Sequence, residues 1–268
     1  MKIGNSFFDT EKKSYIMGIL NVTPDSFSDG GKWNDRDKAL RHVEQMINEG
    51  MDILDVGGES TRPGYVRISE SEEIERVCPI IQNIKSQFDI PVSLDTYKPE
   101  VAVEGIKAGA DLINDIWGLK YDDRMGKVIS DFGVACCLMH NKEKAEYSDF
   151  EKNLISELKE SIDLAINAGI GKDRIILDPG VGFAKDVSEN LKCISSIDEI
   201  KALGFPVLLG CSRKSVIGKV LDLPVDDRLE GTLATTAIGV LKGAAFIRVH
   251  DIKENRRAVD MALAIRNS

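Results

Sequence analysis

Polar and charged residues follow a series of short apolar segments along this 268-residue chain. Each segment is rich in Val, Ile and Leu, and the polar groups at their ends are Asn21, Asp55, Asp95, Asn114, His140, Asp178, Ser212-Arg213-Lys214 and Arg248-Val249-His250. Asp, Asn and Ser are also common at helix starts and in turns, so one such residue alone indicates little. Cations make poor N-caps, however, and a polar group at every segment end indicates a shared functional site.

These polar residues divide into two groups by charge. Hydrogen-bond acceptors form the first group: Asp55, Asp95, Asn114 and Asp178. Cationic or protonatable side chains form the second: Arg62, Arg213, Lys214, Arg248 and His250. A carboxylate can accept two hydrogen bonds from the N–H/NH2 edge of a guanidine-like heterocycle. The pattern therefore predicts a ligand with a flat donor edge at one end and a phosphate at the other.

The elements that must position these residues are predicted from the apolar segments and the amphipathic stretches between them. We expect strands at Tyr15–Leu20, Ile53–Val56, Val92–Leu94, Leu112–Ile113, Ala135–Met139, Ile175–Leu177, Val207–Leu209 and Phe246–Val249. We expect helices at Asp37–Asn48, Ser71–Gln87, Pro99–Ala108, Asp122–Phe132, Asp149–Ala168, Val187–Leu203, Arg228–Leu241 and Lys253–Arg266. Gly50, Gly109, Gly169 and Gly243 follow helical stretches and predict left-handed helix ends. Lys2–Phe8 predicts one short additional strand.

Apolar strands that alternate with helices indicate a parallel sheet covered on both faces. Repetition of the strand–helix unit eight times predicts an α/β fold, the (β/α)8 TIM barrel, and we expect residues 1–268 to form a single domain. An open doubly wound sheet is the alternative, which the lack of a GxGxxG motif after the first strand disfavours. In TIM barrels the active site lies at the C-terminal ends of the strands, and the last two loops frequently bind phosphate. A helix starting near Ser212–Ser215 would add free backbone N–H groups to that anion site.

Composition limits the classes of function. The formal net charge is −9, which argues against sequence-independent nucleic-acid binding. The five cysteines include no CxxC pair and are odd in number, which favours free thiols in a reducing compartment. No apolar run approaches the roughly 18 residues of a membrane helix, and Met1 to Ser14 lacks the apolar region of a signal peptide. We therefore expect a cytoplasmic protein that does not bind membranes.

Two long loops and one helix carry further predictions. The loops Asn21–Gly31 and Gly57–Gly64 are rich in turn residues and are expected to act as lids that exclude water. The helical segment Gly231–Leu241 has no charged residue, although an outer barrel helix should present a polar face to water. We expect a second copy of the chain to cover it, so that the protein is a homodimer.

Five segments together resemble the dihydropteroate synthase family. They are NVTPDSFSDGG (Asn21–Gly31), GGESTRPG (Gly57–Gly64), DPGVGF (Asp178–Phe183), GCSRKSVIG (Gly210–Gly218) and RVHD (Arg248–Asp251), and the resemblance runs from Tyr15 to the C-terminus. The resemblance implies that the protein is a TIM-barrel enzyme of folate biosynthesis and that sulfonamides target it. The implied reaction joins 6-hydroxymethyl-7,8-dihydropterin diphosphate to 4-aminobenzoate, with release of diphosphate and formation of 7,8-dihydropteroate.

The resemblance also implies the roles of individual residues. Asp95, Asn114 and Asp178 would hold the donor edge of the pterin, Lys214 its ring acceptors, and Arg248 its face, with Asp55 beneath the site. Asn21 would bind Mg2+ beside the diphosphate, whose oxygens would contact Thr61, Arg62 and His250. Phe27, Pro63, Phe183, Arg213 and Ser215 would form the 4-aminobenzoate pocket. The expected catalytic groups are Asp95, Lys214, Arg248, His250 and, on the first loop, Asp29. The reaction is expected to be SN1-like at the exocyclic carbon of the pterin, with no enzymic nucleophile.

Three other functions are weighed against this one. A pterin-binding methyltransferase barrel would share the pterin-binding Asp and Asn positions but needs no diphosphate site. A binding protein without turnover is disfavoured because Asn21, Arg62, Lys214 and His250 are all present. A sugar-phosphate aldolase would require a Schiff-base lysine at the end of an inner strand, where the sixth strand offers only Asp178.

Overall fold

The computed structural model describes residues 1–22, 31–59 and 67–268, with the backbone alone for residues 31–36. Its main sheet has eight strands: β3 (Tyr15–Asn21), β4 (Ile53–Gly57), β5 (Val92–Asp95), β6 (Leu112–Asp115), β7 (Ala135–Met139), β8 (Ile175–Asp178), β9 (Leu208–Leu209) and β10 (Phe246–Val249). Every strand pair is parallel, in the order β8-β7-β6-β5-β4-β3-β10-β9. A bridge between Leu177 and Val207 joins the two outer strands and closes the barrel. The predicted TIM barrel is therefore confirmed.

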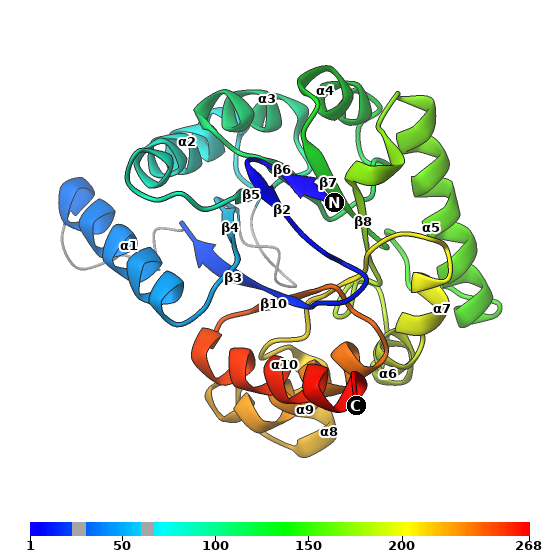
Figure 1. Ribbon diagram of the computed structural model, residues 1–268. Coiled ribbons are helices and arrows are strands. Elements are labelled where there is room, and N and C mark those ends of the chain that lie inside the picture. The colour runs from blue at the N-terminus through cyan, green and yellow to red at the C-terminus, as the bar shows by residue number, and fades with distance from the viewer. Residues whose placement is uncertain (23–30, 60–66) are drawn as a thin grey trace.

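Helices surround the barrel on its outside (Figure 1). They are α1 (Gly31–Asn48), α2 (Glu70–Gln87), α3 (Pro99–Ala108), α4 (Arg124–Phe132), α5 (Phe150–Asn167), α6 (Val187–Ser195), α7 (Ile197–Lys201), α8 (Ser215–Leu221), α9 (Leu229–Leu241) and α10 (Ile252–Arg266), with short 3-10 turns at Lys172–Arg174 and Val225–Asp227. None of the helices in the described ranges is both long and apolar enough to cross a membrane.

Alternate residues of each strand face opposite sides of the sheet, and this alternation separates the core from the site. Outward residues such as Leu54, Leu94 and Leu177 pack against the helices in one large apolar cluster. Inward residues near the strand starts, such as Met17 and Phe246, form a second apolar cluster inside the barrel. The inward positions that follow toward the C-terminal ends are polar. The expectation of apolar strands therefore holds for the outward positions and for the inward positions near the strand starts, but not for the inward positions near the C-terminal ends.

The N-terminal segment differs from the prediction. Lys2–Phe8 is an antiparallel hairpin of two strands, β1 (Lys2–Ile3) and β2 (Ser6–Phe7), and not a single strand. Gly4 has a positive φ of 56° at the turn between them. Ile3 and Phe8 are buried in the inner apolar cluster, and the Phe8 ring lies 5.7 Å from that of Phe246. The hairpin therefore closes the N-terminal end of the barrel (Figure 1).

Two helix predictions also change in detail. The expected helix Val187–Leu203 is divided into α6 and α7 at Ser196, whose backbone N–H closes α6 by donating to the carbonyl of Lys192. The first helix begins at Gly31 and not at Asp37. The four predicted helix-ending glycines all have positive φ angles, from 92° at Gly169 to 117° at Gly109, as expected for left-handed helix ends.

Candidate active site

The C-terminal end of the barrel, called here the mouth, contains a largely buried cluster of one cation and two carboxylates. Arg248, on β10, donates from Nε to Asp55 Oδ2 at 2.6 Å and from Nη2 to Asp95 Oδ2 at 2.8 Å. The Asp55 side chain is fully buried and also accepts from Ser93 Oγ at 2.5 Å and from Asn114 Nδ2 at 3.4 Å. Burial alone would lower the pKa of Arg248, but Asp55 and Asp95 outweigh that effect and raise it. Arg248 is therefore fixed in its charged form.

Asp95 has an unused acceptor. Its Oδ1 is buried and has no hydrogen-bond partner within the described ranges. Burial raises the pKa of this carboxyl to about 7, and Asp55 adds to the rise while Arg248 opposes it. A buried polar atom without a partner is costly unless a ligand satisfies it. Asn114 lies directly beside Asp95, its partner in the β5–β6 register. The pair therefore offers neighbouring polar groups to a ligand.

The other side of the mouth holds Asp178 and Lys214. Asp178 ends β8, and its Oδ1 accepts from the backbone N–H of Gly180 at 2.7 Å. Lys214 Nζ donates to the carbonyl of Val181 and lies 4.9 Å from the centre of the Phe183 ring. Burial raises the pKa of Asp178 and lowers that of Lys214, while each group opposes the shift of the other. The structure thus brings Asp178, Phe183 and Lys214 together, and their roles in binding stay predictions.

The turn after β9 positions Lys214 through a strained residue. Arg213 has a φ of 57°, which costs energy for a residue other than glycine. Its side chain forms a two-pronged ion pair with Asp251, with Arg213 Nε 3.0 Å from Asp251 Oδ2. Its backbone N–H donates to Thr232 Oγ1 at 3.1 Å, and its carbonyl accepts from Arg228 Nη1 at 3.0 Å. The surrounding contacts therefore hold the conformation that directs Lys214 to Val181.

His250 lies beside this turn, as the sequence predicted. Ser212 Oγ lies 3.0 Å from His250 Nδ1 and accepts from the His250 backbone N–H at 3.2 Å. His250 and Arg213 line a cavity of about 430 Å³ together with residues of α1 and α10. Ser215 is exposed and is the first residue of α8, which confirms the expected helix start. The predicted cationic site residues that lie within the described ranges thus gather at the ends of β9 and β10. They are Arg213, Lys214, Arg248 and His250.

Asn21 offers an oxygen ligand at the end of β3. It pairs in register with Gly57, and a Cβ placed on Gly57 would lie 3.8 Å from Asn21 Oδ1 and 3.6 Å from Asp95 Cβ. Glycine therefore leaves an open cradle between an amide oxygen and a carboxylate. Mg2+ prefers oxygen ligands and usually takes only one or two from protein, with water and substrate phosphate supplying the rest. The donors present at this position fit that ion.

Five predicted site residues lie outside the described residues. They are Phe27 and Asp29 in the first loop, and Thr61, Arg62 and Pro63 in the second. Their predicted contacts with diphosphate and 4-aminobenzoate stay predictions, as do the roles of the two loops.

The structure adds a buried ion-pair network that the sequence did not indicate. Lys98 Nζ lies 2.7 Å from both Glu59 Oε2 and Glu73 Oε2, and it donates to the carbonyl of Ile68 at 2.9 Å. Glu59 Oε2 also accepts from the Ile68 backbone N–H at 2.9 Å. Glu59 and Ile68 lie on either side of the second loop, so the network fixes the two ends of that loop. Glu59 lies within the GGES sequence, but no local pattern pairs it with Lys98.

Comparison with known proteins agrees with this geometry. Residues 17–250 match the family model of the pterin-binding enzymes. The dihydropteroate synthase of Clostridium beijerinckii is 57% identical over 262 residues, which cover 97% of each chain. That of Bacillus subtilis is 49% identical and covers 96% of this chain and 90% of its own.

Solved structures agree as well. A dihydropteroate synthase from Clostridium difficile, determined in the presence of pteroic acid, has a TM-score of 0.94 and 49% identity, covering 97% of this chain and 99% of its own. The Xanthomonas albilineans enzyme with 4-aminobenzoic acid has a TM-score of 0.91 and 38% identity, covering 96% of this chain and 94% of its own.

The barrel and the polar groups at its mouth define the class of pterin-binding enzymes. Within this class, the similarity extends over nearly the whole length of the relatives. The chain belongs to the dihydropteroate synthase family, whose members are transferases of a pterin-methyl group.

Proposed function

We propose that the mouth of this barrel joins 6-hydroxymethyl-7,8-dihydropterin diphosphate to 4-aminobenzoate, and that the groups described above bind the pterin. Asp95 and Asp178 would accept hydrogen bonds from its donor edge, beside Asn114, while Lys214 would donate to its ring acceptors. The observation that carries the proposal is the buried, unpartnered Asp95 Oδ1 in the described structure. A guanidine-like edge supplies the donors that such a carboxylate needs.

Arg248 has a separate role in this proposal. Its two hydrogen bonds to Asp55 and Asp95 fix the plane of the guanidinium. A planar guanidinium stacks well on an aromatic ring, so Arg248 would lie against the face of the pterin. Asp55 is fully buried and bonded to Ser93 and Arg248. Its contribution is therefore to hold Arg248 and not to contact the ligand.

The diphosphate would extend from the pterin toward the β3 and β10 ends of the mouth. Asn21 would hold Mg2+ there, and the bound ion would offset the charge of the leaving diphosphate. His250, held by Ser212, would contact the diphosphate oxygens, together with Thr61 and Arg62 from the second loop.

The 4-aminobenzoate would enter above the pterin. Its carboxylate would lie near Ser215 and Arg213, and its ring near Phe183, Phe27 and Pro63. Exposure of Ser215 and partial exposure of Arg213 support access from solvent at this point.

The reaction then proceeds by dissociation. The C–O bond to the exocyclic pterin carbon breaks, and the diphosphate leaves with the electron pair. The cation that remains is conjugated with the electron-rich dihydropterin, and Asp95 stabilises it electrostatically. The aromatic amine attacks the carbon and then loses its proton to solvent. Asp29 would help to close the site over the cation, and no side chain forms a covalent intermediate.

Three measurements test this function. Diphosphate release should require Mg2+, the pterin diphosphate and 4-aminobenzoate together; release of diphosphate without 4-aminobenzoate incorporation would contradict it. For the dissociative route, 18O placed in the bridging position should scramble within bound pterin diphosphate before the amine attacks. Strictly amine-dependent release without such exchange would argue for direct displacement. A sulfonamide that mimics 4-aminobenzoate should compete with that substrate alone.

We also infer that the protein acts as a homodimer through α9 and α10. These helices pack against each other, yet Ile238 and Leu241 on α9, and Met261 and Ile265 on α10, are between 45% and 62% exposed. Apolar surface of this kind is stabilised by a second subunit. Sedimentation at micromolar concentration should give about twice the 29.5 kDa chain mass, and Ile238→Glu should give monomers. A single-chain mass for the unmodified protein would contradict the dimer.

A further inference from the structure

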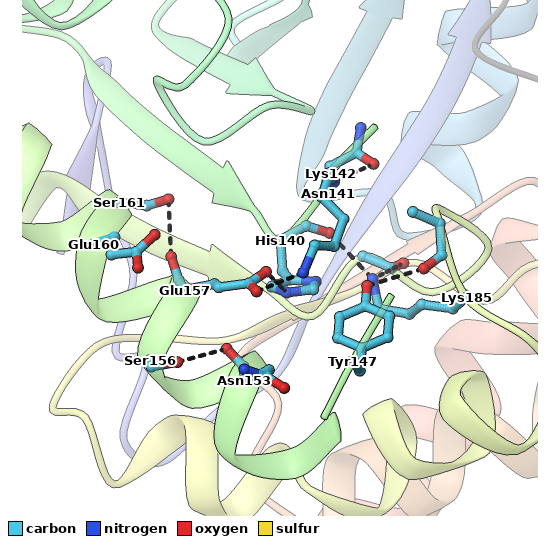
Figure 2. Close-up of polar contacts among 12 residues, drawn as sticks. His140, Asn141, Lys142, Tyr147, Asn153, Ser156, Glu157, Glu160, Ser161 and Lys185 are labelled. Carbon is cyan, nitrogen blue, oxygen red and sulfur yellow. Dashed lines mark hydrogen bonds and ion pairs between the residues drawn. The ribbon is translucent and has the colours of Figure 1, made fainter. Parts of the chain in front are cut away.

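A partly buried lysine outside the predicted site lies under the turn that carries Asp178. Lys185 follows the DPGVGF segment, and its ammonium is surrounded by backbone carbonyls (Figure 2). Lys185 Nζ donates to the carbonyls of Gly180 at 3.0 Å, Phe183 at 3.0 Å and His140 at 3.2 Å. One side chain therefore links the end of β7 to both halves of the turn after β8.

The turn needs such a link because its backbone is unusual. Gly180 and Gly182 have positive φ angles of 71° and 89°, and Ala184, which has a side chain, has a φ of 44°. A Cβ on Gly180 would lie 2.0 Å from the carbonyl oxygen of His140, so the two segments are in close contact. Several carbonyls of the turn point toward one place, where a positive charge stabilises them.

The same turn delivers the pterin-binding groups. Asp178 begins it, the Val181 carbonyl accepts the hydrogen bond of Lys214, and the Phe183 ring packs beside the Lys214 ammonium. Lys185 contacts residues on both sides of Val181 but does not bond to Asp178 or Lys214 in the described structure. Its effect on the site therefore passes through the shape of the turn.

The surroundings of Lys185 keep it in this place. Tyr147 donates to the Ala184 carbonyl at 2.9 Å. The His140 ring is held at 2.8 Å by Glu157, which also pairs with Lys142 at 2.7 Å (Figure 2). Burial, with the nearby lysines adding to its effect, lowers the pKa of His140 to about 2, so the ring stays neutral beside the ammonium. Burial also lowers the pKa of Lys185 to about 8, which leaves it mostly charged at pH 7.

From this geometry we infer that Lys185 is a positioning residue: its ammonium fixes the Asp178–Phe183 turn so that Asp178 and Lys214 together fit the pterin. The inference rests on the proposed function and deepens it. Lys185 touches no substrate in this account. It sets the affinity for the pterin through Asp178 and Lys214. Because Phe183 lies on the same turn, it also influences the expected 4-aminobenzoate pocket.

The test measures ligand binding without turnover. Calorimetry with 6-hydroxymethyl-7,8-dihydropterin diphosphate should show that Lys185→Met raises the Kd by roughly 10- to 100-fold, since a small displacement of positioned groups has effects of this size. The KM for 4-aminobenzoate should rise as well, because Lys185 also holds the Phe183 carbonyl. In Lys185→Ala, added propylammonium should occupy the vacated position and restore part of the pterin affinity.

Two control variants separate positioning from general stability. Lys120→Met removes another mouth lysine that donates to a carbonyl, that of Glu157, without contact to the turn. Ile129→Val trims a fully buried side chain of α4 far from the mouth and lowers the Tm modestly. Neither should alter the pterin Kd. If the pterin Kd of Lys185→Met equalled that of these controls, the role of Lys185 would be wrong and the proposed function would stand. If the unmodified protein failed to bind the pterin diphosphate, both would be wrong.

Discussion

The two sides of the barrel mouth hold their charges by different means. On the carboxylate side (Asp55, Asp95 and Arg248), full charges pair with each other at 2.6 and 2.8 Å. On the lysine side (Asp178, Lys185 and Lys214), the ammonium groups are bonded to backbone carbonyls, and no ion pair joins these three residues in the described structure. On the first side both carboxylates pair with Arg248 before any ligand arrives, whereas the ammonium groups of the second side have no carboxylate partner among these residues.

This difference has an energetic consequence. Removing one member of a buried ion pair leaves the other charge uncompensated, which is among the more costly changes that a protein can undergo. Removing an ammonium bonded to a carbonyl leaves only a dipole without a donor. We therefore expect substitutions on the carboxylate side to reduce both stability and activity, and substitutions on the lysine side to reduce mainly activity.

The largest effect is expected for Arg248→Met. Two buried carboxylates lose their cation, so the free energy of unfolding should fall by about 3–5 kcal/mol. Coupling should fall by at least roughly 100-fold, because a preorganised charged group is lost from the site. Urea unfolding and diphosphate release measure the two quantities.

A double variant serves as the control for this prediction. When Arg248→Met is combined with Asp55→Asn, only one carboxylate, Asp95, lacks its cation. The double variant should therefore regain part of the lost stability and none of the lost activity. If Arg248→Met unfolded at the same urea concentration as the unmodified protein, the contrast between the two sides would be wrong.

Lys214→Met tests the lysine side. Coupling should again fall by roughly 100-fold, because the donor to the pterin acceptors is lost. The free energy of unfolding should change by no more than about 1 kcal/mol, since only one hydrogen bond to a carbonyl is removed. Burial lowers the pKa of Lys214, so the folded protein stabilises its charge less well than water does, and losing that charge offsets part of the cost. A stability loss as large as that of Arg248→Met would remove the distinction.

The sequence predicts which carboxylates lie at the mouth, but not how Arg248 pairs with them. Strand ends are recognisable from apolar runs, and barrel topology brings their inward residues together, so Asp55, Asp95 and Asp178 could be placed from the sequence alone. The pairing of Arg248 with both Asp55 and Asp95 depends on a barrel register that joins residues more than 150 positions apart. No local pattern contains that register.

Residues that support the site are the ones the sequence does not reveal. Lys185 has the appearance of a surface lysine in a loop, and its burial depends on where the His140 carbonyl lies across the turn. Lys98 likewise becomes a buried charge only because α2 brings Glu73 to it. In the N-terminal segment, the periodicity of Lys2–Phe8 is too short to reveal the turn at Gly4, so the hairpin was predicted as a strand.

The carboxylate side should also make pterin binding depend on pH. Asp95 has a pKa of about 7 in the folded protein, well above that of an ordinary carboxyl, chiefly because it is buried. Only the ionised carboxylate accepts two hydrogen bonds from the pterin. The affinity for the pterin should therefore rise about tenfold per pH unit as the pH approaches 7 from below, and level off above pH 7. Calorimetry in buffers of different ionisation enthalpy should detect proton release on binding at pH 6. Asp95→Asn should abolish that release.

The same group has the opposite effect on stability. Between about pH 4 and pH 7 the folded protein retains a proton on Asp95 that the unfolded chain has already lost. Raising the pH through this window therefore lowers the free energy of unfolding, and the Asp95→Asn variant should lack this decline. Urea unfolding at several pH values measures this. If the free energy of unfolding rose with pH to the same extent in the unmodified protein and in Asp95→Asn, the raised pKa would be contradicted.

The smallest effect is expected for Asp251→Asn. This variant tests an ion pair that lies on the lysine side, and so distinguishes the effect of ion pairing from the effect of location in the mouth. Arg213 and Asp251 form a full ion pair beside Lys214, but the Arg213 side chain is 39% exposed. A pair this accessible to water contributes little, so the free energy of unfolding should fall by less than about 1 kcal/mol. Arg213 would lose part of its restraint near the expected 4-aminobenzoate pocket, and the KM for that substrate should rise a few-fold. The pterin Kd should change less, because the backbone of Arg213 keeps its bonds to Thr232 and Arg228. If stability instead fell as far as in Arg248→Met, ion pairing itself, and not burial, would govern the cost on both sides.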